Sequence, residues 1–119
     1  MTGFIQIIEY TTTRIDEVRK ASDEFRDARS ASDQAVPVIR GTITADRDRP
    51  DTYLSIVEFP SHDIAMQNSA RPETSAFAAR LSELCDGPPK FYNLDVIDTI
   101  VTLDARQRQP GARSVPLPG

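Results

Sequence analysis

Two prolines constrain which elements the middle of this chain can form. The run Leu54–Leu84 reads LSIVEFPSHDIAMQNSARPETSAFAARLSEL. Pro60 ends the first apolar stretch, because proline lacks the N–H group that a strand interior needs, and Ser61 is a favoured helix N-cap. Pro72 fits the first turn of a helix but breaks a helix interior. The run therefore predicts a strand, a short helix ending near Ser69, and a second helix that starts at Pro72.

The second of these helices carries an apolar stripe. Phe77, Leu81 and Leu84 recur at the spacing that places side chains on one helix face. The helix is expected to end near Cys85, because the Gly-Pro-Pro sequence at 87–89 cannot continue it. A helix with one apolar face packs against another element, so we expect it to cover a sheet.

The rest of the chain alternates between strand and helix patterns. Period-2 alternation or a short apolar run predicts a strand, and apolar residues three and four positions apart predict an amphipathic helix. The predicted elements are a strand Phe4–Tyr10, a helix from Thr13 to about Arg29, a hairpin of strands Val38–Ala45 and Tyr53–Phe59, and a final strand region Phe91–Leu103.

The predicted order β-α-β-β-α-β is the ferredoxin-like unit, an α+β fold with helices on one face of an antiparallel sheet. If the Ile/Leu set of the strands packs under the helices, the other face carries Gln6, Ile8, Tyr10, Arg40, Thr42, Thr44, Tyr53, Ser55, Val57 and Phe59. Such a face is too apolar for open solvent. We therefore expect a homodimer formed through it.

One domain accounts for most of the 119 residues. We place it at Met1–Leu103. The remaining residues, Asp104–Gly119, form a tail that contains Pro, Gly and Arg. This tail is either disordered or an arm that docks on the other subunit through Val115 and Leu117.

Charge and hydropathy exclude two classes of partner. The net charge is −4 and the tail, with three Arg and one Asp, contributes +2, so the body carries −6. Nucleic-acid binding needs a basic surface, so no nucleic-acid partner is expected. No apolar run approaches the roughly 20 residues that span a bilayer, and the start of the chain lacks the features of a signal peptide. We therefore expect no membrane partner and a cytoplasmic location.

A metal site is not expected either. The chain has one cysteine, Cys85, and one histidine, His62, which is too few for a zinc site. Cys85 cannot form an internal disulfide and is interpreted as a small filler residue.

With this order of elements and the pattern FPSHDIAM…ARPETSAFAARL, residues 3–100 resemble the antibiotic-biosynthesis-monooxygenase-like group of dimeric α+β barrel proteins. The resemblance implies a homodimer whose two sheets form a barrel, with a ligand cleft next to the broken helix. Members of this group include oxygenases that use no cofactor, haem-degrading enzymes and signal-molecule isomerases. No cofactor is expected here.

Two branches of the group can be compared by residue. In the oxygenase branch an Asn on the broken helix is followed by a Trp four residues later and a Tyr further on, which together hold a phenolic substrate. Asn68 matches the first position, whereas the others fall at Pro72 and about Ala78, and the chain has no Trp. The haem-degrading branch has an Asn on the first strand, a Trp on the broken helix and an iron-binding His further along. The corresponding positions here are about Ile8, Asn68 and Ala78, so haem chemistry is not expected.

Oxygenation without a cofactor needs a substrate that reduces O2 once deprotonated, and a protein that supplies a base, oxyanion donors and a dry pocket. Our candidate catalytic residues are Asn68 and His62, since the ring of His62 near a helix N-terminus stays neutral and suits a base. The candidate substrate-binding residues are Gln6, Tyr10, Arg40, Tyr53 and Phe59.

Four of these candidate residues also have a purely structural interpretation. His62 in a first helical turn is typically exposed, Arg40 could pair with Glu58 or Asp95, and Tyr10 and Tyr53 could pack at an interface.

Three functions fit these residues. The first is a cofactor-independent monooxygenase that acts on an aromatic or polyketide-like molecule, the second a non-catalytic ligand-binding or assembly module, and the third a polyketide-type cyclase.

Overall fold

The computed structural model describes residues 3–31 and 36–101, which form four strands and three helices. In chain order these are β1 (Phe4–Thr11), α1 (Ile15–Ser30), β2 (Arg40–Ala45), β3 (Thr52–Phe59), α2 (His62–Ser69), α3 (Pro72–Leu84) and β4 (Lys90–Asp95). The predicted α+β order is confirmed, and the second helical region is divided in two, as the prolines predict.

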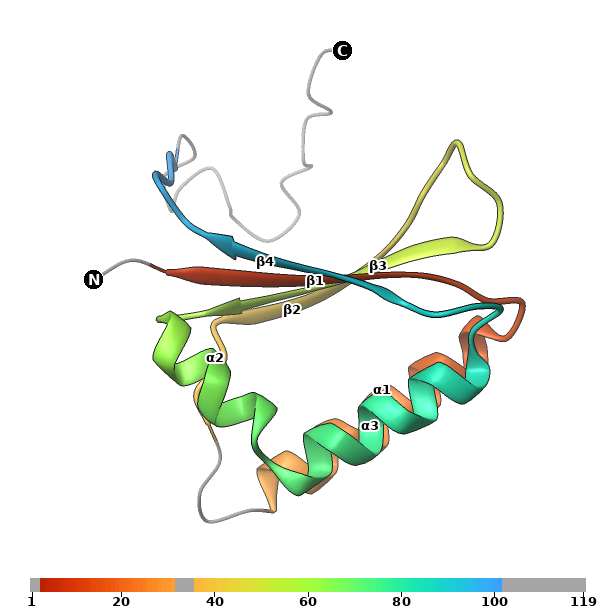
Figure 1. The fold of residues 1–119 in the computed structure, drawn as a ribbon, viewed down its shortest axis with the longest axis horizontal. Coiled ribbons are helices and arrows are strands. Elements are labelled where there is room, and N and C mark those ends of the chain that lie inside the picture. The colour runs from red at the N-terminus through yellow and green to blue at the C-terminus, as the bar shows by residue number, and fades with distance from the viewer. Residues whose placement is uncertain (1–2, 32–35, 102–119) are drawn as a thin grey trace, which may run out of the picture.

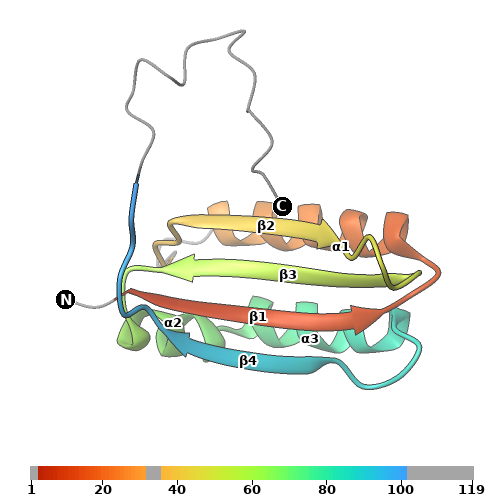
Figure 2. The same ribbon diagram turned by 90° about the horizontal axis from the view of Figure 1, so that it is seen from above.

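The four strands form one sheet in the order β2-β3-β1-β4, with every neighbouring pair antiparallel. Figure 2 looks onto this sheet, with β2 and β4 at its edges. All three helices lie on one side of it (Figure 1). This is the ferredoxin-like arrangement. Within the described ranges, no helix is long and apolar enough to cross a membrane.

The first helix starts two residues later than predicted. Arg14 is its N-cap and makes no side-chain capping bond. The preceding Thr12 is fully buried, where its hydroxyl donates to the carbonyl of Leu84 at 2.6 Å and accepts from the N–H of Arg14 at 3.0 Å. Thr12 therefore fixes the entry of α1 to the end of α3.

The final strand is shorter than predicted. β4 ends at Asp95, and residues 96–101 have no regular structure. Ile97 and Ile100 are largely exposed there. The backbone of Val96 still bonds to Gly3, after which the chain leaves the sheet. The rest of the predicted strand region and the tail Asp104–Gly119 lie outside the described residues.

The structure places the side chains of β1 and β3 on the opposite sheet faces from those predicted. Seven of the residues expected on the outer face lie on the helix-covered face: Gln6, Ile8, Tyr10, Tyr53, Ser55, Val57 and Phe59. Tyr10 packs against Val18 and Leu81, and the register pairs Tyr10 with Tyr53. Both faces of β1 are apolar, so alternation could not decide between them. The aromatic rings fill the space under the helices.

The face turned away from the helices, here called the outer face, has an apolar centre. Strand alternation and register place on it Ile5, Ile7, Leu54, Ile56, Tyr92 and Leu94, together with Arg40, Thr42 and Thr44 from β2. The β2 residues lie on the face that was predicted for them.

The core under the helices consists of two separate clusters. One surrounds the end of β1 at Tyr10 and includes Val18, Leu81 and Leu84; the other surrounds Phe4, Phe59 and Ala65. The middle of the helix-covered face lies between them.

Candidate functional site

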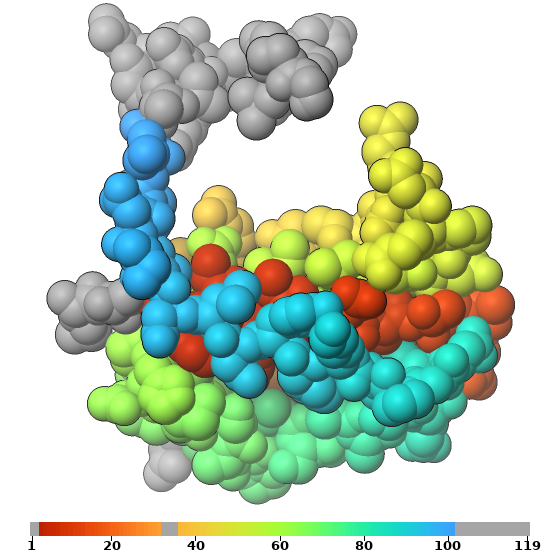
Figure 3. Space-filling model, turned by 45° about the horizontal axis from the view of Figure 1, so that its top comes forward, coloured from red at the N-terminus to blue at the C-terminus, as the bar shows by residue number. Residues whose placement is uncertain are grey.

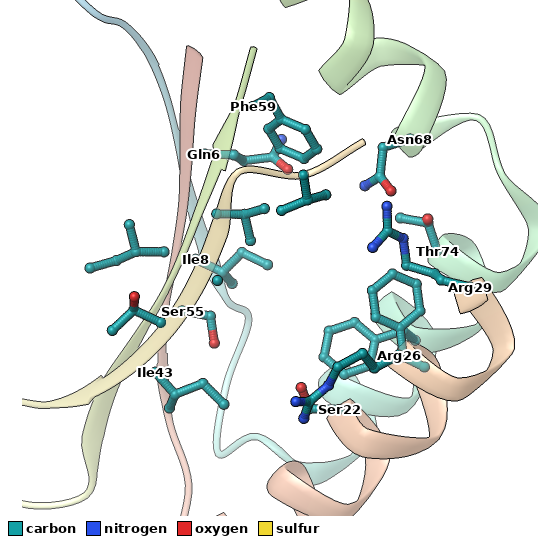
Figure 4. Close-up of a pocket in the computed structure, with 17 residues that line it drawn as sticks. Gln6, Ile8, Ser22, Arg26, Arg29, Ile43, Ser55, Phe59, Asn68 and Thr74 are labelled. Atoms are coloured by element: carbon teal, nitrogen blue, oxygen red, sulfur yellow. The ribbon is translucent and has the colours of Figure 1, made fainter. Parts of the chain in front are cut away.

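A cavity of about 330 Å³ lies between the sheet and the helices, at the lower end of the roughly 300–1,000 Å³ typical of small-molecule sites. Its apolar lining comes from all layers of the fold: Ile8 of β1, Val57 and Phe59 of β3, Ile43 of β2, Phe25 of α1 and Phe77 of α3. Figure 4 draws the lining residues as sticks, with Ile8, Ile43 and Phe59 labelled on the sheet side of the space. The cavity is lined within one chain and reaches the broken helix.

One wall of the cavity contains a stacked aromatic pair. The rings of Phe25 and Phe77 are stacked, with centroids 5.0 Å apart and an interplanar angle of 19°. Ile8 and Val57 line the cavity from the sheet. An aromatic ligand buries a large apolar area in such a site and can pack edge-on or in an offset stack against these rings.

Asn68 is the buried polar group of the cavity. It is 8% exposed, and its Oδ1 atom has no hydrogen-bonding partner in the protein. The local sequence fixes its position, because the hydroxyl of Ser61 caps α2 by accepting from the N–H of Ile64 at 3.2 Å, and Pro72 starts the next helix. A buried unsatisfied amide oxygen destabilises a fold by about 1–3 kcal/mol, so Asn68 is a candidate for contact with a ligand.

Two further polar groups line the cavity with Asn68. The hydroxyl of Thr74 is buried and has no partner in the protein. Arg29 donates to the carbonyl of Val36, and its guanidinium lies over the ring of Phe25, 5.8 Å from the centroid. Figure 4 draws Asn68, Thr74 and Arg29 toward the same end of the space.

The ionisable groups around the cavity are positive. Among the described residues that line it, Arg26 and Arg29 are the only ionisable ones. Arg26 forms an exposed ion pair with Asp23. The pKa of the nearby Glu73 carboxyl is lowered, first by its own backbone N–H, then by Arg71, and to a smaller extent by Arg29. The cavity is therefore locally cationic in an acidic protein.

Of the candidate site residues, Asn68, Gln6 and Phe59 line the cavity. The side-chain amide of Gln6 donates to Asn93 at 3.0 Å, and Phe59 is 1% exposed. These three come from α2, β1 and β3 and meet at the α2 end of the sheet.

The two tyrosines lie beside the cavity in the adjoining core cluster. Tyr10 and Tyr53 are stacked with centroids 6.0 Å apart, and the Tyr10 hydroxyl bonds to Ser55 at 3.0 Å. Burial raises the pKa of Tyr10, although the Ser55 bond opposes this. Ser55 itself lines the cavity, so Tyr10 reaches it only through that hydroxyl.

His62 and Arg40 lie outside the cavity. His62 is the first residue of α2, with 57% of its side chain exposed and its ring edge-on to Phe4. Arg40 lies on the outer face in a bidentate pair with Glu58, at 2.5 and 3.2 Å, as the pairing interpretation predicts. This pair lowers the pKa of Glu58.

Several lining residues were not named as site candidates from the sequence, and the most important for the polar end and the aromatic wall are Phe25, Arg29 and Thr74. Phe25 and Arg29 are four residues apart and therefore share a helix face, and this spacing could have connected the arginine to the apolar stripe. Nothing in the sequence indicates that the hydroxyl of Thr74 would be buried.

The sequence matches no protein-family profile and no curated protein. Solved structures do match. SnoaB, a cofactor-independent oxygenase from Streptomyces nogalater, is 17% identical with a TM-score of 0.68, covering 84% of this chain and 98% of its own. Rv0793 from Mycobacterium tuberculosis is 14% identical with a TM-score of 0.66, covering 83% of this chain and 99% of its own. An antibiotic biosynthesis monooxygenase is 13% identical with a TM-score of 0.62, covering 80% of this chain and 99% of its own.

The chain has the antibiotic-biosynthesis-monooxygenase fold. The resemblance predicted from the broken helix is thereby confirmed as a likeness of fold over most of the chain. A likeness of fold does not assign a reaction, so function has to be argued from the cavity.

Proposed function

We propose that this protein binds a planar aromatic or polyketide-like molecule in the cavity and oxygenates it without a metal or flavin. The observation that carries the proposal is Asn68, which is buried and whose Oδ1 acceptor has no partner in the protein, beside a stacked aromatic pair. The fold shared with SnoaB, a cofactor-independent oxygenase, supports the same class of chemistry. We also expect the protein to act in the cytoplasm.

The chemistry follows from the groups that line the cavity. A phenol or anthrone that loses a proton becomes an electron-rich anion, and this anion can reduce O2 directly. For an anthrone, one oxygen atom ends as a carbonyl on the ring carbon, which loses both of its hydrogens, and the other oxygen leaves as water. For a phenol, the two hydrogens of that water come from the ring carbon and from the hydroxyl group, which becomes the second carbonyl. The Nδ2 amino group of Asn68 can donate a hydrogen bond to the anion, and Arg29 can stabilise its charge. No carboxylate or imidazole lines the described part of the cavity, so the proton passes to water and the protein acts by lowering the pKa of the bound substrate.

We propose further that two copies pair through their outer faces. Six apolar side chains form the centre of this face, and ion pairs at its margin join Arg40 to Glu58 and Arg49 to Glu9. In Figure 3 the segment after β4 and the β2–β3 turn rise at opposite ends of the sheet, with a hollow between them. A second copy of the sheet fits such a hollow and removes the apolar centre from water.

Oxygen uptake tests the proposed reaction. Wild-type protein in metal-free buffer is expected to consume O2 with an anthrone or a dihydroxynaphthalene, and Asn68→Ala is expected to reduce the rate by roughly 10–100-fold, because a hydrogen bond to a charged group is lost. Gln67→Ala is the matched control, since Gln67 is the exposed neighbour on the same helix. No uptake across a broad panel of phenols would rule out the oxygenase.

A non-catalytic ligand-binding module is the second candidate. One observation favours it: the position four residues after Asn68 is Pro72, and the chain has no Trp to hold a phenolic ring there. This candidate predicts saturable binding of the same aromatic molecules, with a raised melting temperature and no product.

A further inference from the structure

The charge of the cavity narrows the class of ligand that it can hold. Arg26 and Arg29 are the only ionisable side chains lining its described part, although the chain carries a net charge of −4. A guanidinium stays charged across the whole pH range of interest. A cleft with apolar walls and charges of one sign concentrates ligands of the opposite sign. The cavity therefore favours an anion.

Arg29 is the arginine suited to hold that anion. It is half-buried, whereas Arg26 is exposed and already paired with Asp23. One amino group of Arg29 donates to the carbonyl of Val36, and within the described residues no carboxylate forms an ion pair with it. A guanidinium has five N–H donors, so donors remain for a ligand.

Thr74 and Asn68 can add to these donors. The hydroxyl of Thr74 is buried and has no partner in the protein, so it is free to donate. Asn68 can donate through its Nδ2 amino group, whereas its unpartnered Oδ1 atom is an acceptor. Together with Arg29 they can satisfy several acceptor positions at one end of the cavity. A carboxylate offers about four such positions on two oxygens and matches the guanidinium fork, whereas a phenolate offers a single oxygen.

We propose that the ligand is an aromatic carboxylic acid, with its carboxylate on Arg29, Asn68 and Thr74 and its rings against the Phe25–Phe77 pair. This inference rests on the proposed ligand-binding role of the cavity and specifies its substrate class. The stacked Phe25–Phe77 pair contacts the apolar rings of the ligand, and Arg29 binds its carboxylate.

Calorimetric titration with three probes of similar shape tests this: 2-naphthoate, its neutral amide 2-naphthamide, and 2-naphthol. Wild-type protein is expected to bind 2-naphthoate about tenfold or more tightly than the amide, because a charge-assisted bond replaces a neutral one. Arg29→Gln is expected to remove this preference, and Arg29→Lys to keep part of it, since lysine retains the charge but not the fork. Arg19→Gln, an exposed position on the same helix, is the matched control and should change nothing.

The outcomes separate this inference from the proposed function. Unchanged amide binding by Arg29→Gln supports it, because the cavity is then intact and only the anion preference is lost. Equal binding of naphthoate and amide, or tighter binding of naphthol, overturns the carboxylate and leaves the proposed function standing. If none of the three probes binds, both the carboxylate inference and the proposed function are refuted. If Arg29→Gln does not fold, the comparison of naphthoate with amide in the wild type decides the matter.

Discussion

A buried amide oxygen without a partner destabilises a fold, and α2 places one at Asn68. Natural proteins retain such groups chiefly where function requires them. Asn68 could be singled out from the sequence because capping and helix breaking explain Ser61 and Pro72 but not Asn68. Arg29 could not, since a charged residue near a helix end is usually solvated.

Asn68→Leu should separate stability from function. We expect the free energy of unfolding to rise by about 1 kcal/mol, because an unsatisfied buried amide is replaced by an apolar group, while binding of an aromatic ligand is lost. Urea unfolding and calorimetric titration measure the two effects. Gln67→Leu is the exposed control and should alter neither by much. A loss of stability in Asn68→Leu would mean that the amide is a structural group.

Tyr10 gives a prediction in alkaline solution. Burial raises its pKa in the folded state, whereas in the unfolded chain the pKa is about 10. The unfolded chain therefore loses this proton first, so the stabilising contribution is complete below about pH 10 and decreases as the pH rises through the folded-state pKa. Urea unfolding at pH 9 and pH 11 should show this decrease in the wild type and a smaller one in Tyr10→Phe. Equal decreases in the wild type and in Tyr10→Phe would contradict the assignment of this pH effect to Tyr10.

At the scale of elements, the sequence identified the type and order of every helix and strand that the structure describes, because Pro60, Ser61 and Pro72 act locally. It did not identify which face of β1 the helices cover. That choice depends on the volume of Phe4, Tyr10 and Phe59 against the helices, which is a tertiary property. The cavity residues contributed by β1 and β3 were consequently placed on the wrong face.

The N-cap of α2 should matter for both stability and binding. Ser61→Ala removes the bond from the Ile64 N–H and is expected to cost about 1 kcal/mol of unfolding free energy. Ligand affinity should fall as well, because this helix positions Asn68. Ser82→Ala, at an exposed position on α3, is the control and should leave both nearly unchanged. A Ser61→Ala variant as stable as the wild type would show that tertiary contacts alone hold α2.

At the scale of the whole molecule, the four-stranded sheet has helices on one face and an apolar centre on the other. The sequence predicted such a second face correctly, although most of the side chains assigned to it belong to the opposite face. Apolar residues on both sides of β1 and β3 explain both results, since a strand buried on two faces shows little alternation.

Pairing of two copies should be visible in solution. We expect multi-angle light scattering to give twice the 13.2 kDa chain mass, and Ile7→Lys to give the monomer, because a charge at the centre of the outer face would be buried without a partner. Ala79→Lys, exposed on α3, should remain dimeric. A wild-type protein that is monomeric at micromolar concentration would refute the pairing.

The position of a bound ligand tests the central claim, that the cavity between sheet and helices is the functional site. A crystal of the protein with 6-bromo-2-naphthol, measured at the bromine edge, locates the ligand through a single anomalous peak. The account predicts this peak inside the cavity, with the rings against Phe25 and Phe77 and the hydroxyl within hydrogen-bonding distance of Asn68 or Arg29. A fully occupied peak on the outer face, or an empty cavity at a saturating concentration of ligand, would contradict it.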